Sequence, residues 1–389
     1  MLPSLLESVR RIEPTLRACA PEAERERRLP EAAVEAMRKE NLLGLWRPKA
    51  FGGLEADPIT AFQVLEEVSR IDSAAGWNLQ LAAGGQMFGA WFDDQGARES
   101  FGEKNSVMVG SFFPPRKAVP VEGGYRVTGQ SAFVSGAHMA TSIVGLAHIY
   151  EDGKGPKLAE NGAPVGLMTI CPAHEAVIVD NWRTLGMRGT GSHDVLMQDV
   201  YVPARRTAVL KPLDRPGSAY QGPLYRLTLW PVVSALASTA LGIGRAAIDD
   251  LIALAGKKTP SYMARGLRDR EIIQSAIGEA EAALGAARAY LYEALREAWD
   301  WAVAGDLIDM PRKMKLQLAA THAGIAAARV TELVHRAAGT SGIREEQPFE
   351  RHFRDAHTIT QHAFISAGRY ESGGQYFLGA PIEWPFYGI

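Results

Sequence analysis

Residues 268–304, RDREIIQSAIGEAEAALGAARAYLYEALREAWDWAVA, decide the fold class because they read as one long amphipathic helix. Its apolar residues recur at spacings of three and four and make a single stripe, which consists of Ile273, Ile277, Ala280, Leu284, Ala287, Leu291, Ala294, Leu295 and Ala298. Pro311 can open a second long helix that runs to about Ala338. Long helices with short connections predict a four-helix bundle over residues 211–389.

An uncharged stretch precedes this helix. Residues 227–244, LTLWPVVSALASTALGIG, are barely long enough to span a bilayer, and they contain a proline, two serines and two threonines. A helix that is apolar on every side is typical of the centre of a bundle. We therefore expect a buried core helix and no contact with a membrane.

The rest of the chain divides into a helical part and a strand-rich part. Residues 1–104 contain apolar residues at helical spacing, with helix starts at Pro58 and at the capping pair Asp72 and Ser73. Residues 105–210 contain short β-rich runs separated by glycine and proline, which are SVMVGSF, GYRVTGQ, SIVGLAHIY, PVGLMTIC, AVIVD and DVLMQDVYVP. We expect a hairpin at Gly123 and an exposed loop over residues 151–163. The predicted fold is α+β and mainly helical, with an N-terminal helical domain, a middle β-sheet domain and a C-terminal bundle.

Composition excludes several classes of protein. The 389 residues include 42 Lys and Arg against 44 Asp and Glu, a net charge of −2, without the basic excess that nucleic acids or anionic membranes require. Two cysteines, Cys19 and Cys171, cannot form a disulfide framework or a four-thiolate zinc site. The N-terminal residues lack the pattern of a signal peptide, so a cytoplasmic protein is expected.

Common cofactor motifs are absent from the sequence. No G-x-G-x-x-G joins a strand to a helix, so a nicotinamide-binding Rossmann unit is not expected, and no G-x-S-x-G is present. Residues 256–259, GKKT, are not a P-loop because Leu251 stands where the first glycine belongs. His352, His357 and His362 recur every five residues, which turns them about 140° apart on a helix, so they cannot chelate one metal ion.

Three segments, in this order, carry a resemblance to a known family. They are GGYRVTGQSAFVSGA at 123–137, WRTLGMRGTGSHDVLMQDVYVP at 182–203 and FERHFRDAHTITQH at 349–362. Together with the order of helices, sheet and bundle, they resemble the acyl-CoA dehydrogenase superfamily over nearly the whole chain. Within it, the chain is most similar to the reduced-flavin-dependent monooxygenases, which are the oxygenase halves of two-component systems.

One departure from the dehydrogenases indicates the branch. Those enzymes need a carboxylate base, nine residues after the arginine of an Arg-Asp-Ala signature or, in a minority, at the start of the first bundle helix. Ala363 and Val232 occupy these positions here, so this chain lacks the carboxylate base of an acyl-CoA dehydrogenase. His362 matches the active-site histidine of the monooxygenases, which implies a base or a group that orients a flavin C4a-hydroperoxide. The alternative is a helix histidine bonded to a neighbour.

The resemblance also implies residues that meet the flavin ring. Ser135 would reach flavin N5 through its hydroxyl, and the backbone amides of Val134, Ser135 and Gly136 would lie along the N1–C2=O edge. Phe133 would stack near the ring. The alternatives are a serine at the end of a strand beside a turn glycine, and an ordinary core aromatic residue.

The second segment implies further flavin contacts. Arg188, Thr190 and Ser192 alternate with glycines, which lets backbone amides approach an anion such as a flavin phosphate. Trp182 would flank the isoalloxazine. We interpret the neighbouring His193 as solvated or as a capping residue rather than a catalytic one.

Two outlying segments would reach a cofactor held by a neighbouring subunit. Arg265 falls where the superfamily often presents an arginine to a flavin phosphate, although other basic residues nearby compete for this role. Gly339 and Thr340 lie in a run, AGTSG, that resembles a loop touching a partner's cofactor. The alternative for this run is a helix C-cap followed by a turn.

A hydroperoxide needs apolar walls that exclude water. Trp77, Phe112, Phe113 and Trp230 are candidates for these walls and for selecting a flat aromatic substrate, and each also fits an ordinary core position.

The resemblance implies an oxygenase that hydroxylates a small aromatic or heteroaromatic compound with O2. Reduced FMN or FAD would come from a separate reductase, and the chain would form a homotetramer without a metal. Three alternatives stay open: an acyl-CoA dehydrogenase with an unrecognised base, an N- or S-oxygenating flavoenzyme, and a relative without flavin that binds or assembles rather than catalyses.

Overall fold

The computed structural model describes residues 1–389 except 152–154, 161, 214–215 and 389. The first part is a cluster of helices with the bounds α1 (Leu2–Glu26), α2 (Glu31–Lys39), α3 (Pro58–Ile71), α4 (Ser73–Gly85) and α5 (Asp94–Phe101). The side chains of Asp57 and Asp72 accept backbone N–H groups at the starts of α3 and α4. Both helix starts agree with the sequence pattern, because an aspartate at this position satisfies a free amide of the first turn.

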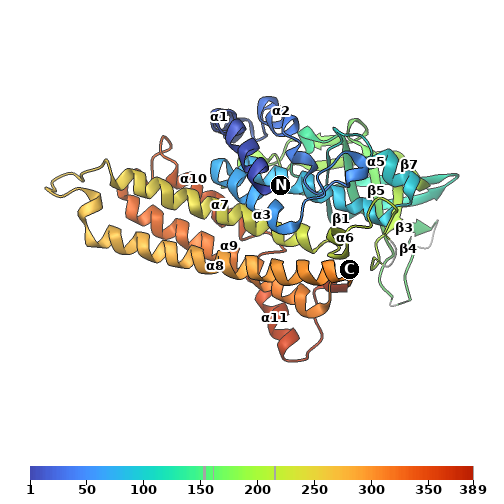
Figure 1. The fold of residues 1–389 in the computed structure, drawn as a ribbon. Coiled ribbons are helices and arrows are strands. Elements are labelled where there is room, and N and C mark those ends of the chain that lie inside the picture. Colours follow the sequence, from blue (N-terminus) through green and yellow to red (C-terminus); the bar gives the residue numbers. More distant parts are fainter. Residues whose placement is uncertain (152–154, 161, 214–215, 389) are drawn as a thin grey trace.

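A sheet follows, at one end of the molecule (Figure 1). Its strands are β1 (Met108–Val121), β2 (Gly124–Ser131), β3 (Ser142–Glu151), β4 (Gly155–Pro156), β5 (Gly166–Pro172), β6 (Val177–Val179), β7 (Asp194–Pro203) and β8 (Thr207–Val209). The strand order is β6-β7-β2-β1-β3-β5-β8, with β4 paired to β3. Neighbours are antiparallel except for the parallel pair β1–β3. Gly123 turns the chain between β1 and β2 with φ +75°, as its position in a hairpin requires.

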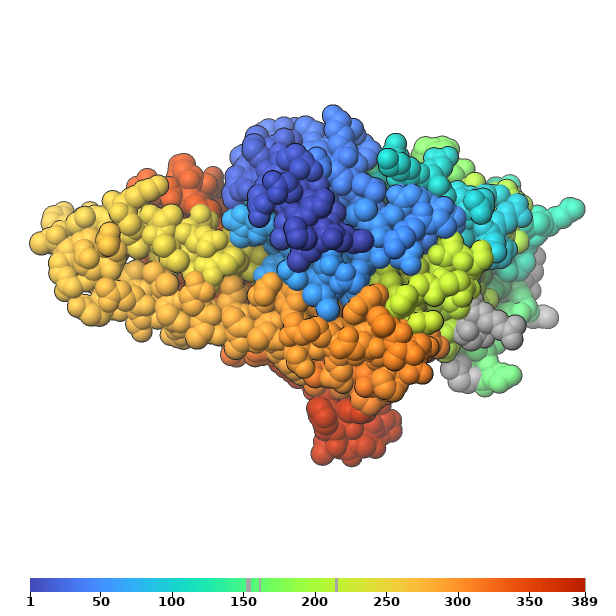
Figure 2. All heavy atoms as spheres, in the orientation of Figure 1, coloured from blue at the N-terminus to red at the C-terminus, as the bar shows by residue number. Residues whose placement is uncertain are grey.

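The last part is helical again. Its helices are α6 (Pro223–Arg226), α7 (Trp230–Ala255), α8 (Glu271–Ala304), α9 (Met310–Ala338), α10 (Phe349–Ile359) and α11 (Arg369–Phe377). The helices α7, α8 and α9 run side by side, and α10 packs against α7 and α9. The prediction of four long helices is therefore only partly right, because α10 has 11 residues. The remaining chain forms α11, which stands out from the body in Figure 2.

The uncharged stretch lies in α7, as the core-helix interpretation requires. Among the described residues, α7 is the one helix long and apolar enough to cross a membrane, and 89% of its most apolar window is buried inside the protein. The helices α3 and α4 cover one side of α7, while α8, α9 and α10 cover others. This burial explains the absence of charge, since a helix enclosed by other helices presents no face to water.

Two details of the middle part differ from the sequence pattern. The strand β1 extends to Val121 instead of ending at Phe112. The register of its pairing with β3 shifts between Ser111 and Arg116, and the pairing resumes beyond the shift. Part of the expected loop 151–163 lies outside the described residues. Within the described part, Gly155–Pro156 forms the short strand β4.

Candidate active site

Two distant segments meet where β2 ends and β7 begins. Ser131, the last residue of β2, pairs with Val195 at the start of β7, so the residues that follow β2 lie beside those that precede β7. The backbone N–H of Gly136 donates to the carbonyl of Thr190 at 3.0 Å. Sheet pairing thus places two of the three segments that carry the family resemblance in direct contact.

A row of buried hydroxyl groups occupies this contact. Ser135 Oγ lies 2.6 Å from Ser192 Oγ, which lies 2.6 Å from Thr190 Oγ1. The indole Nε1–H of Trp77, on α4, donates to Ser135 Oγ at 3.0 Å. All four residues are buried, so water does not compete for these bonds.

The position of Trp77 depends on close packing of α4. Nearly every residue of α4 is buried, and Gly76 lies directly against Ser69 of α3. A Cβ atom on Gly76 would come within 1.9 Å of Ser69 Oγ, so the two helices approach as closely as a glycine permits. This approach seats the Trp77 indole over the end of β2.

The loop that carries Thr190 is organised around the backbone of Met187. The carbonyl of Met187 accepts the Thr190 hydroxyl at 2.8 Å, the Trp182 indole N–H at 3.0 Å and the Thr190 backbone N–H at 3.2 Å. One backbone carbonyl therefore ties together Trp182 and Thr190, two of the residues expected to hold a cofactor.

His193 is a buried capping residue. Its Nδ1 accepts the backbone N–H groups of Asn181 and Trp182 at 3.2 and 3.1 Å, and its Nε2 faces the carbonyl of Arg27 at 3.3 Å. Burial lowers the pKa of His193. The capping interpretation is confirmed, and the solvated alternative is wrong, because the side chain is enclosed between the 181–182 turn and the end of α1.

A buried cluster of charges connects α10 to this loop. Asp355 Oδ1 accepts the Met187 backbone N–H at 2.5 Å, and Asp355 Oδ2 accepts the Ser73 hydroxyl at 2.5 Å. Arg351, one turn earlier, bonds Asp72 at 2.6 Å. Burial opposes the charge of Arg351, but Asp72, Asp355 and Glu24 raise its pKa. The cluster fixes α10, α4 and the loop at 182–193 relative to one another.

His362 follows the end of α10 and faces Trp77. The two ring centroids lie 5.6 Å apart in an edge-to-face contact, and the Phe364 ring also stacks on the imidazole, with centroids 5.6 Å apart. The backbone N–H of Phe364 donates to His362 Nδ1 at 3.3 Å, which leaves the ring hydrogen on Nε2. His362 keeps part of its surface accessible, but desolvation by the protein packed around the ring lowers its pKa to about 4.

The turn at 133–136 differs in one respect from expectation. The amides of Val134, Ser135 and Gly136 already donate to protein carbonyls, so they are not free to line a flavin edge in this conformation. The side chains are the available groups. Phe133 is 61% exposed and adopts a left-handed backbone with φ +61°, and its ring meets Trp182 edge to face at 6.3 Å. Strained backbone of this kind collects at ligand sites.

Several expected site residues lie elsewhere. Arg265 is exposed and pairs with Glu271, and Gly339 and Thr340 are exposed at the end of α9. They belong to the connections from α7 to α8 and from α9 to α10, which lie at the end of the bundle far from the sheet in Figure 1, so within one chain they do not join the hydroxyl row. Arg188 is half-exposed and lies 3.7 Å from Glu24.

Of the four residues expected to form the substrate walls, some lie in the site and others lie elsewhere. Trp77 lies in the site. Trp230 is buried against Tyr387 near the C-terminus, as a core residue is, whereas Phe112 is half-buried and packs edge to face on Phe88. Phe113 is 68% exposed, and its carbonyl accepts the Ala132 N–H, which places it beside the turn at 133–136.

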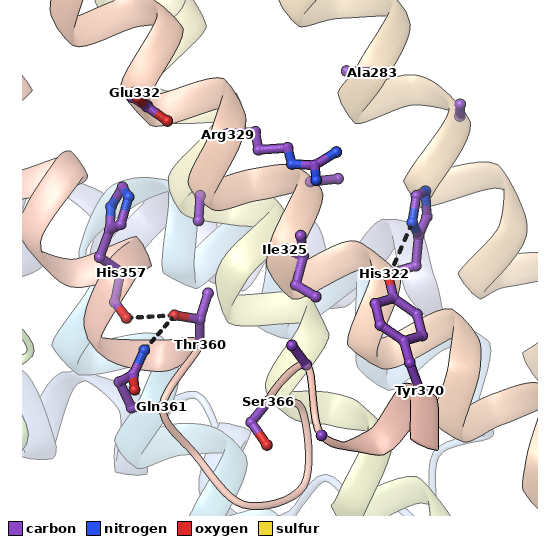
Figure 3. Close-up of a pocket in the computed structure, with 15 residues that line it drawn as sticks. Ala283, His322, Ile325, Arg329, Glu332, His357, Thr360, Gln361, Ser366 and Tyr370 are labelled. Carbon is purple, nitrogen blue, oxygen red and sulfur yellow. Dashed lines mark hydrogen bonds between the residues drawn. The ribbon is translucent and has the colours of Figure 1, made fainter. Parts of the chain in front are cut away.

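A well-formed cavity lies beside the chain that leaves α10, and neither His362 nor Ser135 lines it. It measures about 720 Å³ and lies between α8, α9 and the chain that leaves α10 (Figure 3). Alanines form much of its wall, and His322 faces Tyr370 across it at 3.5 Å. Neither Trp77 nor His362 lines this cavity, so it is separate from the hydroxyl row.

Comparison with known proteins shows the family. A model of the acyl-CoA dehydrogenase N-terminal domain matches residues 4–92, and a model of the acyl-CoA dehydrogenase C-terminal domain matches residues 234–367. Indole-3-acetate monooxygenase of Pseudomonas putida is 34% identical over 369 residues, which cover 93% of this chain and 90% of that protein. The chain belongs to the acyl-CoA dehydrogenase superfamily. Within the superfamily it is a flavin-dependent monooxygenase.

Two further relatives of this superfamily support the branch. The oxygenase subunit HsaA of a flavin-dependent monooxygenase from Rhodococcus jostii (strain RHA1) is 26% identical and covers 95% of this chain and 97% of its own. XiaF from Streptomyces sp., solved with FADH2 and glycerol, matches with a TM-score of 0.89 at 26% identity and covers 99% of this chain and 97% of that chain. The expected fold, enzyme class and flavin requirement are confirmed.

The residues around Ser135 fit a flavin. A flavin needs a flat apolar contact together with polar groups at one ring edge. Phe133 presents an exposed aromatic ring beside Trp182, and the Ser135 hydroxyl lies two residues further on. Buried Asn78 leaves its Oδ1 without a partner close to Gly136, which adds an acceptor at the same turn.

Three contributors to the site escaped the sequence reading. They are Met187, Asp355 and Phe364, which act through a backbone carbonyl, a buried carboxylate and a backbone amide. Only Asp355 carried a signal, because it is the aspartate of the Arg-Asp-Ala run in the third segment. Backbone groups have no signature in the amino-acid sequence, so Met187 and Phe364 could be found only in the folded chain.

Proposed function

We propose that this monooxygenase is the oxygenase component of a two-component system and hydroxylates a small aromatic or heteroaromatic compound. The observation that carries the proposal is the meeting of Trp77, Ser135 and His362, which joins an aromatic wall, a hydroxyl group and a neutral imidazole in one place. Each comes from a different part of the fold. The relatives named for indole-3-acetate and for an oxygenase subunit support the choice of a ring substrate and a separate reductase.

In this proposal reduced FMN or FAD, when bound, supplies the two electrons that activate O2. Phe133 and Trp182 hold the flat ring, and Ser135 meets its edge. Trp77 and Phe364 flank His362 and keep water away from the reacting atoms. One oxygen atom enters the substrate ring and the other leaves as water, so the protein must hold the ring against the activated oxygen and exclude solvent.

His362 acts in this proposal as a hydrogen-bond donor. Its Nδ1 is occupied by the Phe364 N–H, and the hydrogen on Nε2 remains available to a ligand. A general base would need a free ring nitrogen, and a pKa of about 4 makes the imidazole a weak one at neutral pH. These contacts favour the orienting role over the base.

The decisive experiment follows oxygen into product. The protein is incubated with a flavin reductase, NADH, FMN or FAD, and indole-3-acetate under ¹⁸O2, with other small aromatic acids and phenols tested in parallel. We expect a product heavier by one ¹⁸O atom. Release of hydrogen peroxide alone with every compound contradicts the proposal, and bleaching of bound flavin by an acyl-CoA supports a dehydrogenase instead.

We also propose a homotetramer that works in the cytoplasm. Large apolar side chains are exposed outside the site, among them the neighbours Phe377 at 73% and Leu378 at 85%, and a second copy would cover such a surface. The alanine-lined cavity beside α8 and α9 offers a face for a second copy. Both cysteines are free thiols, and Cys171 is buried, which suits a reducing compartment.

A further inference from the structure

The hydroxyl row has a direction that can be assigned by counting hydrogens. A carbonyl cannot donate, so the bond between Thr190 and Met187 uses the single hydroxyl hydrogen of Thr190. Thr190 Oγ1 must then accept from Ser192, and Ser192 Oγ must accept from Ser135. Trp77 donates to Ser135 Oγ. Every hydrogen therefore points from Trp77 toward the carbonyl of Met187.

This direction leaves Ser135 without a hydrogen to offer. Its only hydroxyl hydrogen is held by Ser192, and its backbone N–H donates to the carbonyl of Phe133. A ligand acceptor beside Ser135 would meet an oxygen rather than an O–H group. In the structure as it stands, Ser135 cannot be the donor that the site requires.

The far end of the row can release its hydrogen at low cost. The carbonyl of Met187 also accepts the Trp182 indole N–H and the Thr190 backbone N–H, so it stays satisfied if the Thr190 hydroxyl turns away. Asp355 holds the Met187 N–H and keeps this carbonyl in place. Rotation of the Thr190, Ser192 and Ser135 hydroxyls would reverse the row and break no other bond.

We propose that Thr190 and Ser192 are positioning residues that switch Ser135 between acceptor and donor. When a carbonyl oxygen of the reduced flavin ring, rather than its N5–H, lies against Ser135, Thr190 turns to Ser192, Ser192 turns to Ser135, and the Ser135 hydrogen turns to the ligand. Trp77 donates to Ser135 in both states and holds its oxygen fixed. This inference rests on the proposed function, because it takes the flavin ring as the acceptor.

The test compares two substitutions at one position. Thr190→Val keeps the shape and removes the hydroxyl, so Ser135 Oγ is the one acceptor in the row that remains for the Ser192 hydrogen, and Ser135 can turn its own hydrogen to a ligand with no net loss of a bond in the row. We expect reduced FMN or FAD, measured by anaerobic ultrafiltration, to bind about three- to tenfold more tightly, the worth of one internal hydrogen bond. Thr190→Ser keeps the hydroxyl and should bind like wild type.

A double-mutant cycle separates switching from simple repacking. Ser135→Ala removes the donor, and in this background Thr190→Val should no longer change flavin binding. Ser192→Ala cuts the row at its middle and should tighten binding as Thr190→Val does, which keeps the test valid if the valine variant folds poorly. An effect of Thr190→Val that persists without Ser135, or equal binding by Thr190→Val and wild type, overturns the proposal.

A measurement without flavin distinguishes this proposal from the proposed function. In wild type, Ser135 accepts one hydrogen bond and donates one, whereas Thr190→Val frees Ser192 to donate to Ser135 in part of the molecules, and this second accepted bond weakens the bond from Trp77. The indole N–H resonance of Trp77, assigned with Trp77→Phe, should move upfield in Thr190→Val and stay in place in Thr190→Ser. An unmoved resonance rejects the switch. If the resonance moves but neither reduced flavin binds wild type, the switch stands and the proposed function fails.

Discussion

His362 illustrates how one backbone contact defines a side chain's chemistry. The Phe364 N–H occupies Nδ1, and the rings of Trp77 and Phe364 enclose the imidazole, so the folded protein holds its neutral form. The sequence places a histidine one residue before the position of the missing carboxylate, but its protonation state depends on packing that only the fold provides. An imidazole, unlike a carboxylate, also adds no negative charge beside an anionic reduced flavin.

This protonation state predicts a pH dependence of stability. The pKa of His362 falls from about 6.5 in the unfolded chain to about 4 in the folded one. Between these values the unfolded state binds the proton and the folded state does not, so the free energy of unfolding decreases as the pH falls. The loss is about 3 kcal/mol for the complete shift. Urea unfolding at pH 7 and pH 4.5 should show a smaller acid loss for His362→Gln than for wild type.

The matched control for this experiment is His174→Gln. His174 is exposed and outside the site, so this variant should follow the wild-type pH dependence. His138 and His193, whose pKa values are also lowered, contribute equally to all three proteins and cancel in the comparison. Equal acid losses in His362→Gln and wild type would mean that the folded protein carries a charged His362.

At the scale of elements, α10 does more than carry His362. Through Asp355 and Arg351 it fixes the Met187 carbonyl and the start of α4, so the hydroxyl row and Trp77 share one support. Elements with a local signal were predictable. Asp57 and Asp72 cap helices, and Pro311 lies in the first turn of α9. What could not be predicted are contacts between residues hundreds of positions apart, such as Ser73 with Asp355, because no local pattern encodes them.

Because Asp355 holds these segments together, we expect its substitution to lower the free energy of unfolding, and by more when more of its contacts are removed. Asp355→Ala removes the acceptor for the Met187 N–H and for Ser73 and leaves Arg351 short of a partner, which should lower the free energy of unfolding by about 3 kcal/mol. Asp355→Asn keeps an oxygen for the Met187 N–H and should cost about half as much. Urea unfolding measures both values.

A local measurement shows whether the loss comes from the loop. Hydrogen exchange of the amides at 187–192 should accelerate strongly in Asp355→Ala and weakly in Asp355→Asn. Asp306→Ala, an exposed position between α8 and α9, should change neither stability nor exchange. Unchanged exchange at 187–192 in Asp355→Ala would show that Asp355 does not hold the loop.

At the scale of the whole molecule, the two ends of the bundle have different surroundings. The sheet lies at one end, and the connections from α7 to α8, with Arg265, and from α9 to α10, with Gly339 and Thr340, lie at the other (Figure 1). The resemblance gave all of these residues to a flavin site, and one chain cannot gather them. An assembly of several copies would bring these residues together, because the loop end of one chain can approach the sheet of another. The exposed α11 in Figure 2 fits the same arrangement.

A substitution on the face of α8 tests this assembly. Ala286 is exposed at the edge of the alanine-lined cavity, and an arginine there can be solvated in a single chain but not between packed helices. Light scattering after size exclusion should give wild type a mass about four times that of the 42.2 kDa chain. Ala286→Arg should give a smaller particle with unchanged circular dichroism, whereas Ala159→Arg, in an exposed loop of the sheet, should remain like wild type. A wild-type mass of one chain contradicts the tetramer, and an Ala286→Arg tetramer places the interface on another face.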